Sequence, residues 1–356
     1  MTITLKSGTS ETQVTALNKM LEDEGLQGRL ITGEGDQIVA IIGNELRHRS
    51  FLQNLEGLPF VREVNLVTSP YKPISRDAHP EMNKKDSYGG WISTEVDVGP
   101  VKIGGNNQLE IAAGPCSIDA DNPTLLDEMV HQLYEMGVRI LRGGGHKPRS
   151  DPYTFRGHER RALELGRQVA DRYHMAFVTE PVRSEHIDEV VELADVLQIG
   201  TRNATQGFYL DVVAKTAASQ MPILAKRGKK DSIEKTYLPM ILNMYDNAQG
   251  ESNTNIMLCL RGIETGIDTT RFTCDSGDVE AVREKNILPV WGDPSHSGGL
   301  SRYVVTHARQ YIDGGVHALL VEVYPEGRKS LSDASQAITM AQLGDIMGYA
   351  QQQGRR

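Results

Sequence analysis

The sequence of 356 residues contains only three cysteines, Cys116, Cys259 and Cys274. A small and odd number of cysteines excludes a disulfide framework and fits a reducing compartment. No run of about 18 apolar residues is present, so no transmembrane helix is expected. The first ten residues also lack the apolar stretch of a signal peptide. We therefore expect a cytoplasmic protein without a membrane partner.

An excess of positive charge is missing as well. The 38 Lys and Arg against 47 Asp and Glu give a net charge of −9, which argues against a nucleic-acid partner. Anionic ligands would then have to be attracted by local clusters of basic residues. Glycine, in contrast, is abundant with 35 residues, as expected for a chain with many strand–helix loops.

The pattern of residues 108–356 alternates eight times between a short apolar segment and an amphipathic helical segment. Eight nearly continuous apolar strands separated by helices predict an α/β fold of the (β/α)8 TIM-barrel type. An open, doubly wound sheet is the alternative, but the number and even spacing of the strands favour the barrel. The expected strands are LEIAAGP, VRILRGG, MAFVTE, VLQIG, PILAKR, NIMLCLRG, ILPVWGDP and HALLVEVYP.

Residues 1–72 have a different pattern, β-α-β-β-α-β, which predicts a ferredoxin-like α+β domain. Ser10 stands where it can cap the first helix, ahead of apolar residues at helical spacing. We interpret this domain as regulatory, with support of assembly as the alternative. Residues 73–107 contain Pro73 and Pro80 and are expected to form a linker followed by a β-hairpin.

Four residues that can bind a metal come at or just after the ends of expected barrel strands. One thiol, one imidazole and two carboxylates suit a borderline divalent metal. Each residue alone has an ordinary structural explanation, such as a buried small side chain or a helix cap. Because the active site of such a barrel lies at the carboxyl ends of its strands, together they predict a metal site: Cys116, His296, Glu322 and Asp333.

Basic residues recur at the same strand ends. Glycines after Arg142 let the backbone approach a ligand closely, and Pro148 restricts the directions of Arg149 and Ser150. Such a set indicates small substrates with several negative charges. The basic residues are Arg142, Lys147, Arg149, Arg202, Lys226 and Arg261.

These motifs follow one another in a recognisable order: GPCS, RGG…KPRS, QIG-x-RN, KRG, DPSHSGG, VEV-x-PE and LSD-x-x-QA. In this order the chain resembles type I 3-deoxy-D-arabino-heptulosonate 7-phosphate (DAHP) synthase. It resembles the subgroup with an N-terminal ferredoxin-like, ACT-like regulatory domain. The resemblance extends over nearly the whole chain.

The resemblance implies a metal-dependent condensation of phosphoenolpyruvate (PEP) with erythrose 4-phosphate, the first step of the shikimate pathway. It assigns the metal, Mn²⁺ or Co²⁺ with Fe²⁺ or Zn²⁺ as alternatives, to the four metal ligands named above. It further implies a homotetramer controlled by Tyr or Phe. Lys147, Cys116 and His296 would be catalytic, Arg149 and Ser150 would bind the aldose, and PEP would be bound by Arg142, Lys147, Arg202, Lys226 and Arg261.

Several positions depart from the usual family pattern. They leave open whether the aldehyde is erythrose 4-phosphate or a modified analogue of secondary metabolism. The related 3-deoxy-D-manno-octulosonate 8-phosphate synthase remains an alternative, although the Lys-Pro-Arg segment and the small domain argue against it. The departures are His146, where Phe or Tyr is common, and Thr201, Leu260, Trp291 and Tyr324.

Overall fold

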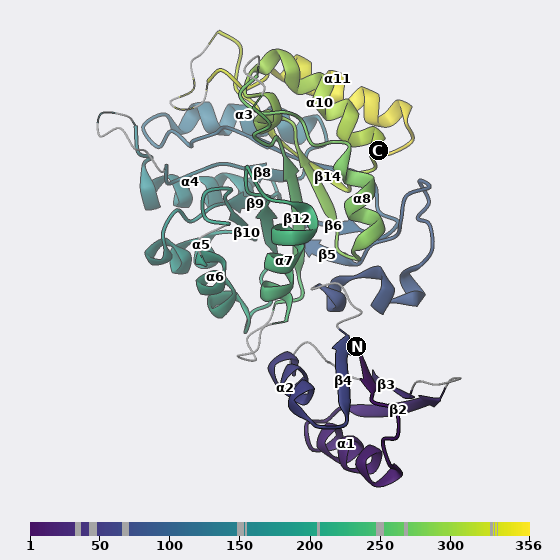
Figure 1. Ribbon diagram of the computed structural model, residues 1–356. Coiled ribbons are helices and arrows are strands. Elements are labelled where there is room, and N and C mark those ends of the chain that lie inside the picture. Colours follow the sequence, from purple (N-terminus) through teal and green to yellow (C-terminus); the bar gives the residue numbers. More distant parts are fainter. Residues whose placement is uncertain are drawn as a thin grey trace. The chain divides into compact units, whose positions relative to one another are not determined.

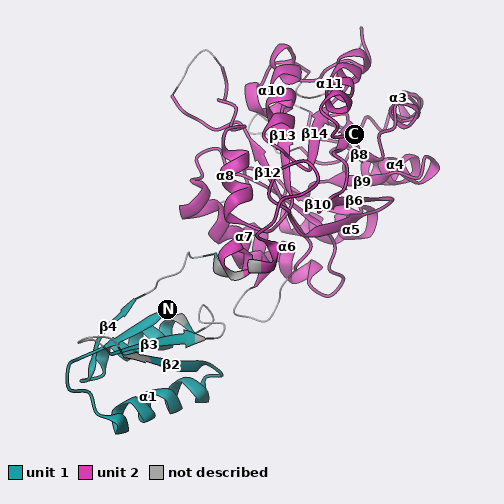
Figure 2. Cartoon of the chain, turned by 90° about the vertical axis from the view of Figure 1, so that its right-hand side faces the viewer, with its two compact units in different colours: residues 1–72 teal, residues 73–356 magenta. Residues whose placement is uncertain are grey.

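The computed structural model describes most of the chain. The chain consists of two compact units, residues 1–72 and residues 73–356 (Figure 2). No helix within the described ranges is long and apolar enough to cross a membrane. The described residues are 1–32, 37–42, 48–65, 71–147, 153, 155–204, 207–246, 253–266, 270–327, 330, 332 and 334–356.

The first unit has the predicted ferredoxin-like fold, a four-stranded antiparallel sheet with strand order β2-β3-β1-β4. Ser10 caps α1 through a capping box with Gln13, and Val14, Leu17 and Leu21 of α1 belong to the core of this unit. The elements are β1 (Thr2–Leu5), α1 (Glu11–Asp23), β2 (Gln27–Thr32), β3 (Gln37–Ile42), α2 (Arg49–Asn54), η1 (Leu55–Gly57) and β4 (Val61–Asn65).

The second unit contains a closed barrel of eight parallel strands surrounded by helices (Figure 1), which confirms the predicted fold. β10 pairs with β9, and this pairing closes the ring. The strands are β7 (Glu110–Gly114), β8 (Ile140–Arg142), β9 (Ala176–Thr179), β10 (Val196–Ile199), β11 (Ile223–Lys226), β12 (Ile256–Arg261), β13 (Val290–Asp293) and β14 (Ala318–Glu322).

A helix follows each of these strands in the chain, and the longer helices bury an apolar face. α3, for example, starts at the cap residue Asn122, has proline as its first residue, and buries Leu126, Val130 and Leu133. The helices are α3 (Pro123–Glu135), α4 (Glu159–Arg172), η5 (Ser184–His186), α5 (Ile187–Leu193), α6 (Phe208–Thr216), η6 (Ile233–Tyr237), α7 (Leu238–Tyr245), α8 (Asp278–Lys285), α9 (Ser295–Gly298), α10 (Ser301–Asp313) and α11 (Met340–Gln352).

The segment between the ferredoxin-like fold and β7 belongs to the same compact unit as the barrel. Its antiparallel hairpin places Val96, Val98 and Ile103 in one apolar cluster with residues from inside the barrel. A Cβ on Gly99 would lie 2.9 Å from Ala176, the first residue of β9, so the hairpin covers the amino-terminal end of the barrel. The segment contains η2 (Lys72–Ile74), η3 (Arg76–Ala78), η4 (Pro80–Met82), β5 (Glu95–Val98) and β6 (Val101–Gly104).

Candidate active site

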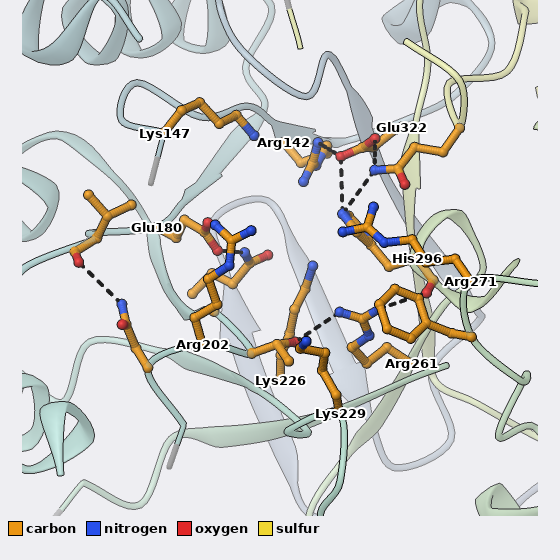
Figure 3. A pocket seen from close by; sticks show the side chains of 17 residues that line it. Arg142, Lys147, Glu180, Arg202, Lys226, Lys229, Arg261, Arg271, His296 and Glu322 are labelled. Carbon is orange, nitrogen blue, oxygen red and sulfur yellow. Dashed lines mark hydrogen bonds and ion pairs between the residues drawn. The ribbon is translucent and has the colours of Figure 1, made fainter. Parts of the chain in front are cut away.

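A polar cavity opens at the carboxyl ends of the barrel strands, opposite the hairpin (Figure 3). Arg142, Lys226 and Arg261 are the last residues of β8, β11 and β12, and Glu322 is the last residue of β14. The register of the strands therefore determines the positions of the Cα atoms that carry these side chains. The full lining is Arg142, Lys147, Glu180, Val182, Gln198, Gly200, Thr201, Arg202, Asn203, Lys226, Lys229, Arg261, Arg271, Phe272, His296, Glu322 and Gln336.

Glu322 supplies a buried carboxylate at one side of this cavity. Its Oε1 accepts a hydrogen bond from Arg142 Nη1 at 3.0 Å and lies 3.5 Å from His296 Nε2. Burial opposes ionisation, but the interactions with His296 and Arg142 outweigh burial and lower the pKa of Glu322 to about 2. Glu322 is therefore ionised at neutral pH and able to bind a cation.

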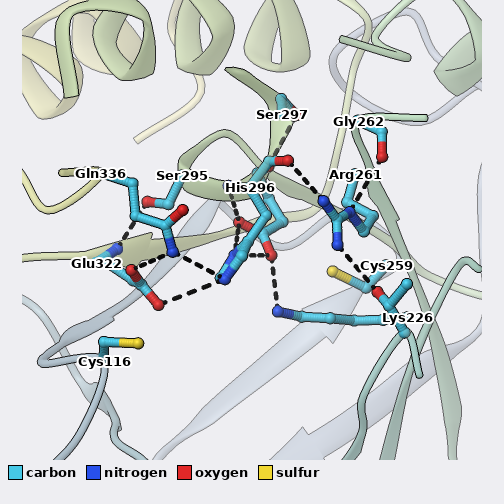
Figure 4. A network of polar contacts seen from close by, with 12 residues as sticks. Cys116, Lys226, Cys259, Arg261, Gly262, Ser295, His296, Ser297, Glu322 and Gln336 are labelled. Atoms are coloured by element: carbon cyan, nitrogen blue, oxygen red, sulfur yellow. Dashed lines mark hydrogen bonds and ion pairs between the residues drawn. The ribbon is translucent and has the colours of Figure 1, made fainter. Parts of the chain in front are cut away.

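A second buried carboxylate, Asp293, contacts His296 on the side of the imidazole that faces away from Glu322. Its Oδ2 is 2.7 Å from Lys226 Nζ and 2.8 Å from His296 Nδ1 (Figure 4). Burial opposes its charge, but His296 and Lys226 lower the pKa of Asp293 well below its usual range. A carboxylate on Nδ1 fixes the orientation of the imidazole, so that Nε2 of His296 is directed toward Glu322.

Cys116 follows β7 and lies beside Glu322 (Figure 4). Cys116 is 2% exposed, and Lys147 Nζ lies 2.8 Å from its Sγ. Burial opposes the charge of Lys147, but Cys116 and Glu322 raise the pKa of this ammonium group. Lys147 is thus positively charged and suited to donate a proton or a hydrogen bond.

Arg261 differs from Arg142 and Lys226, the other buried cations at strand ends in this cavity, because its side-chain hydrogen bonds go to uncharged oxygens. Its guanidinium donates to the carbonyl oxygens of His296, at 2.9 Å, and Gly262, at 3.1 Å. Burial lowers its pKa. A buried cation held mainly by neutral acceptors gains from an anionic ligand, which makes Arg261 a good anchor for a phosphate or carboxylate.

The structure brings most of the predicted site residues to one place. Arg142, Lys147, Arg202, Lys226, Arg261, His296 and Glu322 all line the cavity, and Cys116 contacts Lys147 beside it. Arg149, Ser150 and Asp333, three further predicted site residues, lie outside the residues that the structure describes.

Other residues of the site were not singled out from the sequence. Asp293 stands inside the DPSHSGG motif, and its position at the end of a buried strand was the available signal. Glu180 directly follows β9 and accepts a hydrogen bond from Gln198. Gln336 donates to Glu322 Oε2 at 2.8 Å and lies 3.1 Å from His296 Nε2. Two loop cations, Lys229 and Arg271, also line the cavity. Lys229 lies three residues beyond the end of β11, whereas no strand pattern directly precedes Arg271.

The donor chemistry of this group fits a divalent transition metal. A thiol, an imidazole and a carboxylate come from β7, β13 and β14 or directly after them, and these three strands are neighbours in the barrel. His296 carries the supporting carboxylate that metal-binding histidines usually have. Cys116, His296 and Glu322 therefore offer the donor types that such an ion requires at one side of the cavity.

The rest of the described lining is strongly cationic. It has seven Lys and Arg side chains against the two carboxylates Glu180 and Glu322. Such an excess favours ligands with several negative charges. The site as a whole thus combines metal ligands with binding positions for phosphate and carboxylate groups.

Two family models match the chain. The model described as the DAHP synthetase I family matches residues 82–355, and the model described as the DAHP synthase ferredoxin-like domain matches residues 1–69. Among curated proteins, the phospho-2-dehydro-3-deoxyheptonate aldolase of Thermotoga maritima is 38% identical over 338 residues, 95% of this chain and 93% of the relative. A 2-dehydro-3-deoxyphosphooctonate aldolase of Fusobacterium nucleatum is 26% identical over 277 residues, 72% of this chain and 94% of the relative.

Solved structures agree with these matches. The crystal structure of the DAHP synthase of Thermotoga maritima has a TM-score of 0.72 and 35% identity, and the match covers 99% of this chain and 96% of that one. A truncated form of the enzyme from the same organism has a TM-score of 0.65 and 35% identity, covering 80% of this chain and 95% of that one.

Proposed function

The chain belongs to the DAHP synthetase I family, and on this basis we propose that it condenses PEP with erythrose 4-phosphate and water. The products are DAHP and inorganic phosphate, and the reaction is the first step of the shikimate pathway to the aromatic amino acids. The observation that carries the proposal is the cavity lined by seven basic side chains together with His296 and Glu322, with Cys116 beside it in contact with Lys147.

PEP binding requires several fixed cations because the molecule carries both a phosphate and a carboxylate. We assign this role to five residues whose side chains line the same cavity. Arg142, Lys226 and Arg261 are 6%, 4% and 5% exposed, so their interactions with an anion are little screened by solvent. The five residues are Arg142, Lys147, Arg202, Lys226 and Arg261.

Carbon–carbon bond formation joins the terminal enol carbon of PEP to the aldehyde carbon of the aldose. Negative charge then develops on the aldehyde oxygen, and the protonated Lys147 can donate its proton there. Water adds to the phosphate-bearing carbon of PEP, and the resulting hemiketal phosphate releases inorganic phosphate by C–O cleavage. We assign binding of the aldose to Arg149 and Ser150.

DAHP synthases are in general metal-dependent enzymes. In this chain Cys116, His296 and Glu322 would hold the metal, together with Asp333. The bound ion would supply Lewis-acid polarisation of the aldehyde. We expect Mn²⁺ or Co²⁺, with Fe²⁺ and Zn²⁺ as alternatives. Asp293 keeps His296 in position for this role through the hydrogen bond to Nδ1.

The ferredoxin-like unit provides the place for feedback control in this proposal. It matches a domain model of DAHP synthases and has its own apolar core, so it can respond to a ligand as a separate body. We propose Tyr or Phe as the effector and a homotetramer as the working assembly.

The direct test is phosphate release from PEP with a panel of aldehydes, with and without chelator. We expect turnover with erythrose 4-phosphate, loss of turnover with chelator, and recovery with Mn²⁺ or Co²⁺. The panel adds arabinose 5-phosphate, ribose 5-phosphate and glyceraldehyde 3-phosphate. If arabinose 5-phosphate had a kcat/KM about tenfold higher than erythrose 4-phosphate, a preference of ~1.4 kcal/mol, the octulosonate-synthase alternative would replace this proposal.

A further inference from the structure

A second group of metal-competent side chains lies outside the cavity, where the loop after β8 meets η5 and α5. One donor atom from each of His146, His186 and Glu189 lies within 4.8 Å of the other two. His146 directly precedes Lys147, His186 ends η5, and Glu189 is in the first turn of α5. Residues from two separate segments of the barrel's outer layer therefore converge on one point.

The geometry of this group is compact. The imidazole rings of His146 and His186 are stacked, with centroids 3.8 Å apart and planes 10° from parallel. His146 Nε2 lies 2.5 Å from Glu189 Oε1. His146 is 5% exposed, and the side chain of Glu189 is 17% exposed. These contacts gather the three donor groups, of which His146 is buried and His186 and Glu189 are half-buried. Because stacked rings direct their nitrogens in parallel planes, one of the two imidazoles has to tilt for both to bind one ion.

One polar atom of the group lacks a partner. Nδ1 of His186 is buried and has no hydrogen-bond partner among the residues that the structure describes. A buried nitrogen without a partner costs free energy, and such atoms are uncommon in folded proteins. A metal ion bound to the imidazole would orient the ring and compensate for part of this cost.

The surroundings of the group favour a cation. Glu159, Glu185, Asp188 and Glu192 line the same hollow. Among the described residues that line this hollow, Arg160 is the only Lys or Arg. Arg160 is paired with Glu164 and Glu192. Asp188 and Glu185 are paired with Lys215 and Arg183. Among the described residues of the hollow, Glu159 therefore remains to add to the negative charge of Glu189 that attracts a positive ion.

A comparable cluster elsewhere is less suitable. Asp119, Asp121 and His158 also bring three donor atoms within 4.8 Å. There, the side chain of Asp121 is 68% exposed, and His158 has no buried ring nitrogen that lacks a partner. An exposed acidic cluster of this kind is common without an ion. The group of His146, His186 and Glu189, which has a buried nitrogen without a partner, is the stronger candidate.

We propose that His146, His186 and Glu189 form a second divalent-metal site, distinct from the group around Cys116. Two imidazoles and one carboxylate suit Zn²⁺ or a similar borderline ion. The bound ion would tie the loop that carries Lys147 to η5 and α5. The site stabilises this loop, and its occupancy does not depend on the reaction proposed above.

The test uses the full-length protein with the first metal group removed by Cys116→Ala and His296→Ala. After treatment with chelator, Zn²⁺ is titrated by calorimetry, and thermal melting is followed with and without Zn²⁺. We expect one bound equivalent and a rise in Tm. His186→Phe in the same background keeps a stacked ring but removes both nitrogens, so the equivalent and the rise in Tm should disappear.

Two further variants keep the result unambiguous. Glu189→Gln changes one carboxylate group without changing its size and should weaken Zn²⁺ binding at least tenfold. His131→Ala, on the exposed side of α3, should leave Zn²⁺ binding unchanged. The proposal is overturned if the background protein binds no Zn²⁺, or if folded His186→Phe and Glu189→Gln variants bind Zn²⁺ as the background protein does.

Discussion

At the scale of single residues, two buried carboxylates decide how the cations of the cavity are arranged. Glu322 pairs with Arg142, and Asp293 pairs with Lys226. Each carboxylate satisfies one cation in the absence of substrate and keeps its side chain in a fixed direction. Preorganised cations of this kind stabilise negative charge without having to move during the reaction.

Asp293→Asn tests the support that His296 receives from its carboxylate. The amide keeps the size of the side chain but removes the negative charge of the carboxylate that contacts His296 Nδ1 and Lys226 Nζ. Loss of such a supporting group typically weakens metal binding about 10–100-fold, and we expect a decrease in this range. The measurement is a metal titration of chelator-treated protein, with circular dichroism to confirm that the variant is folded.

Asp313→Asn provides the matched control, because Asp313 lies on α10 and accepts a hydrogen bond from Tyr349 in an exposed position. This variant should bind metal as the unmodified chain does. Equal metal affinity of Asp293→Asn and Asp313→Asn would show that His296 does not depend on Asp293.

Arg202→Ala tests the assignment of PEP binding. A lost hydrogen bond to a charged group costs about 1.5–3 kcal/mol, so the KM for PEP should rise correspondingly while the KM for the aldose changes little. Arg149→Ala should act mainly on the aldose. Steady-state kinetics with each substrate varied in turn measures both effects, and an Arg149 variant that affected only PEP would refute the partition.

The buried Asp275 allows a prediction of how the free energy of unfolding depends on pH. Burial, opposed by Tyr311 and Arg227, raises its pKa from 3.8 to about 6. The folded state then binds a proton more tightly than the unfolded state does. The corresponding stabilisation is fully present below pH 3.8 and is lost as the pH rises through 6. At about 1.36 kcal/mol per pH unit the full difference amounts to about 3 kcal/mol.

The measurement compares Asp275→Asn with the unmodified chain in urea unfolding at about pH 4 and pH 7. The free energy of unfolding of the unmodified chain, relative to the variant, should fall by about 2–3 kcal/mol between these values. Asp278→Asn is the control, since Asp278 pairs with the same Arg227 but is 41% exposed. If the difference between Asp275→Asn and the unmodified chain were constant with pH, the raised pKa would be wrong.

The sequence predicted those site residues whose side chains follow a buried apolar strand, because a polar residue at the end of such a strand stands out. Arg142, Lys226, Arg261 and Glu322 are of this kind. Asp293 occupies the same kind of position but was overlooked, since its partners Lys226 and His296 are apparent only when the strands are assembled. Gln336 lies in a loop and reaches Glu322 only through the tertiary fold.

At the scale of elements, the β5–β6 hairpin is the feature that the barrel pattern alone does not reveal. Its alternating residues predicted two strands, but they could not show what the apolar side chains cover. In the structure the amino-terminal end of the barrel is closed by Val96, Val98 and Ile103. The eight strands, by contrast, were recognisable because parallel strands are buried on both faces and read as continuous apolar runs.

Gly104→Ala tests how closely the hairpin packs. Gly104 has φ +99°, and a Cβ there would lie 2.1 Å from the carbonyl oxygen of Thr94 and 2.9 Å from Pro289. Both the left-handed backbone and the close contact oppose the substitution. Backbone strain alone costs about 1–2 kcal/mol, so the free energy of unfolding of the barrel should fall by more than this.

Gly89→Ala separates the two contributions. Gly89 has φ +82°, but no neighbouring atom lies within 4 Å of the position that a Cβ would take, so only backbone strain remains. Urea unfolding should rank the stabilities as unmodified chain, Gly89→Ala and then Gly104→Ala. Equal losses in the two variants would mean that contact with Thr94 and Pro289 contributes nothing.

At the scale of the whole molecule, the chain consists of two units that each have their own apolar core. Met1, Ile3 and Leu5 belong to the core of the first unit. Among the described residues, this core contains no residue of the barrel. Two separate cores allow one unit to be removed without opening the other. This organisation makes control by the small unit testable.

Deletion of residues 1–72 should leave a folded barrel that still releases phosphate from PEP and erythrose 4-phosphate. The truncated protein should no longer respond to Tyr or Phe, whereas the full chain should be inhibited by one of them, because binding to the small unit biases the conformations of the enzyme. Inhibition curves of both proteins provide the measurement. Equal inhibition of the two proteins would place the effector site in the barrel.

The closing hairpin also affects the order in which the chain can fold during synthesis. Val98 leaves the ribosome before every barrel strand, yet Trp291 of β13, which belongs to the same apolar cluster, is made about 190 residues later. At roughly 5–20 residues per second, these side chains wait about 10–40 s for Trp291. Until the later strands are made, the apolar side of the hairpin is covered only in part, and there a chaperone would bind or neighbouring chains would associate prematurely.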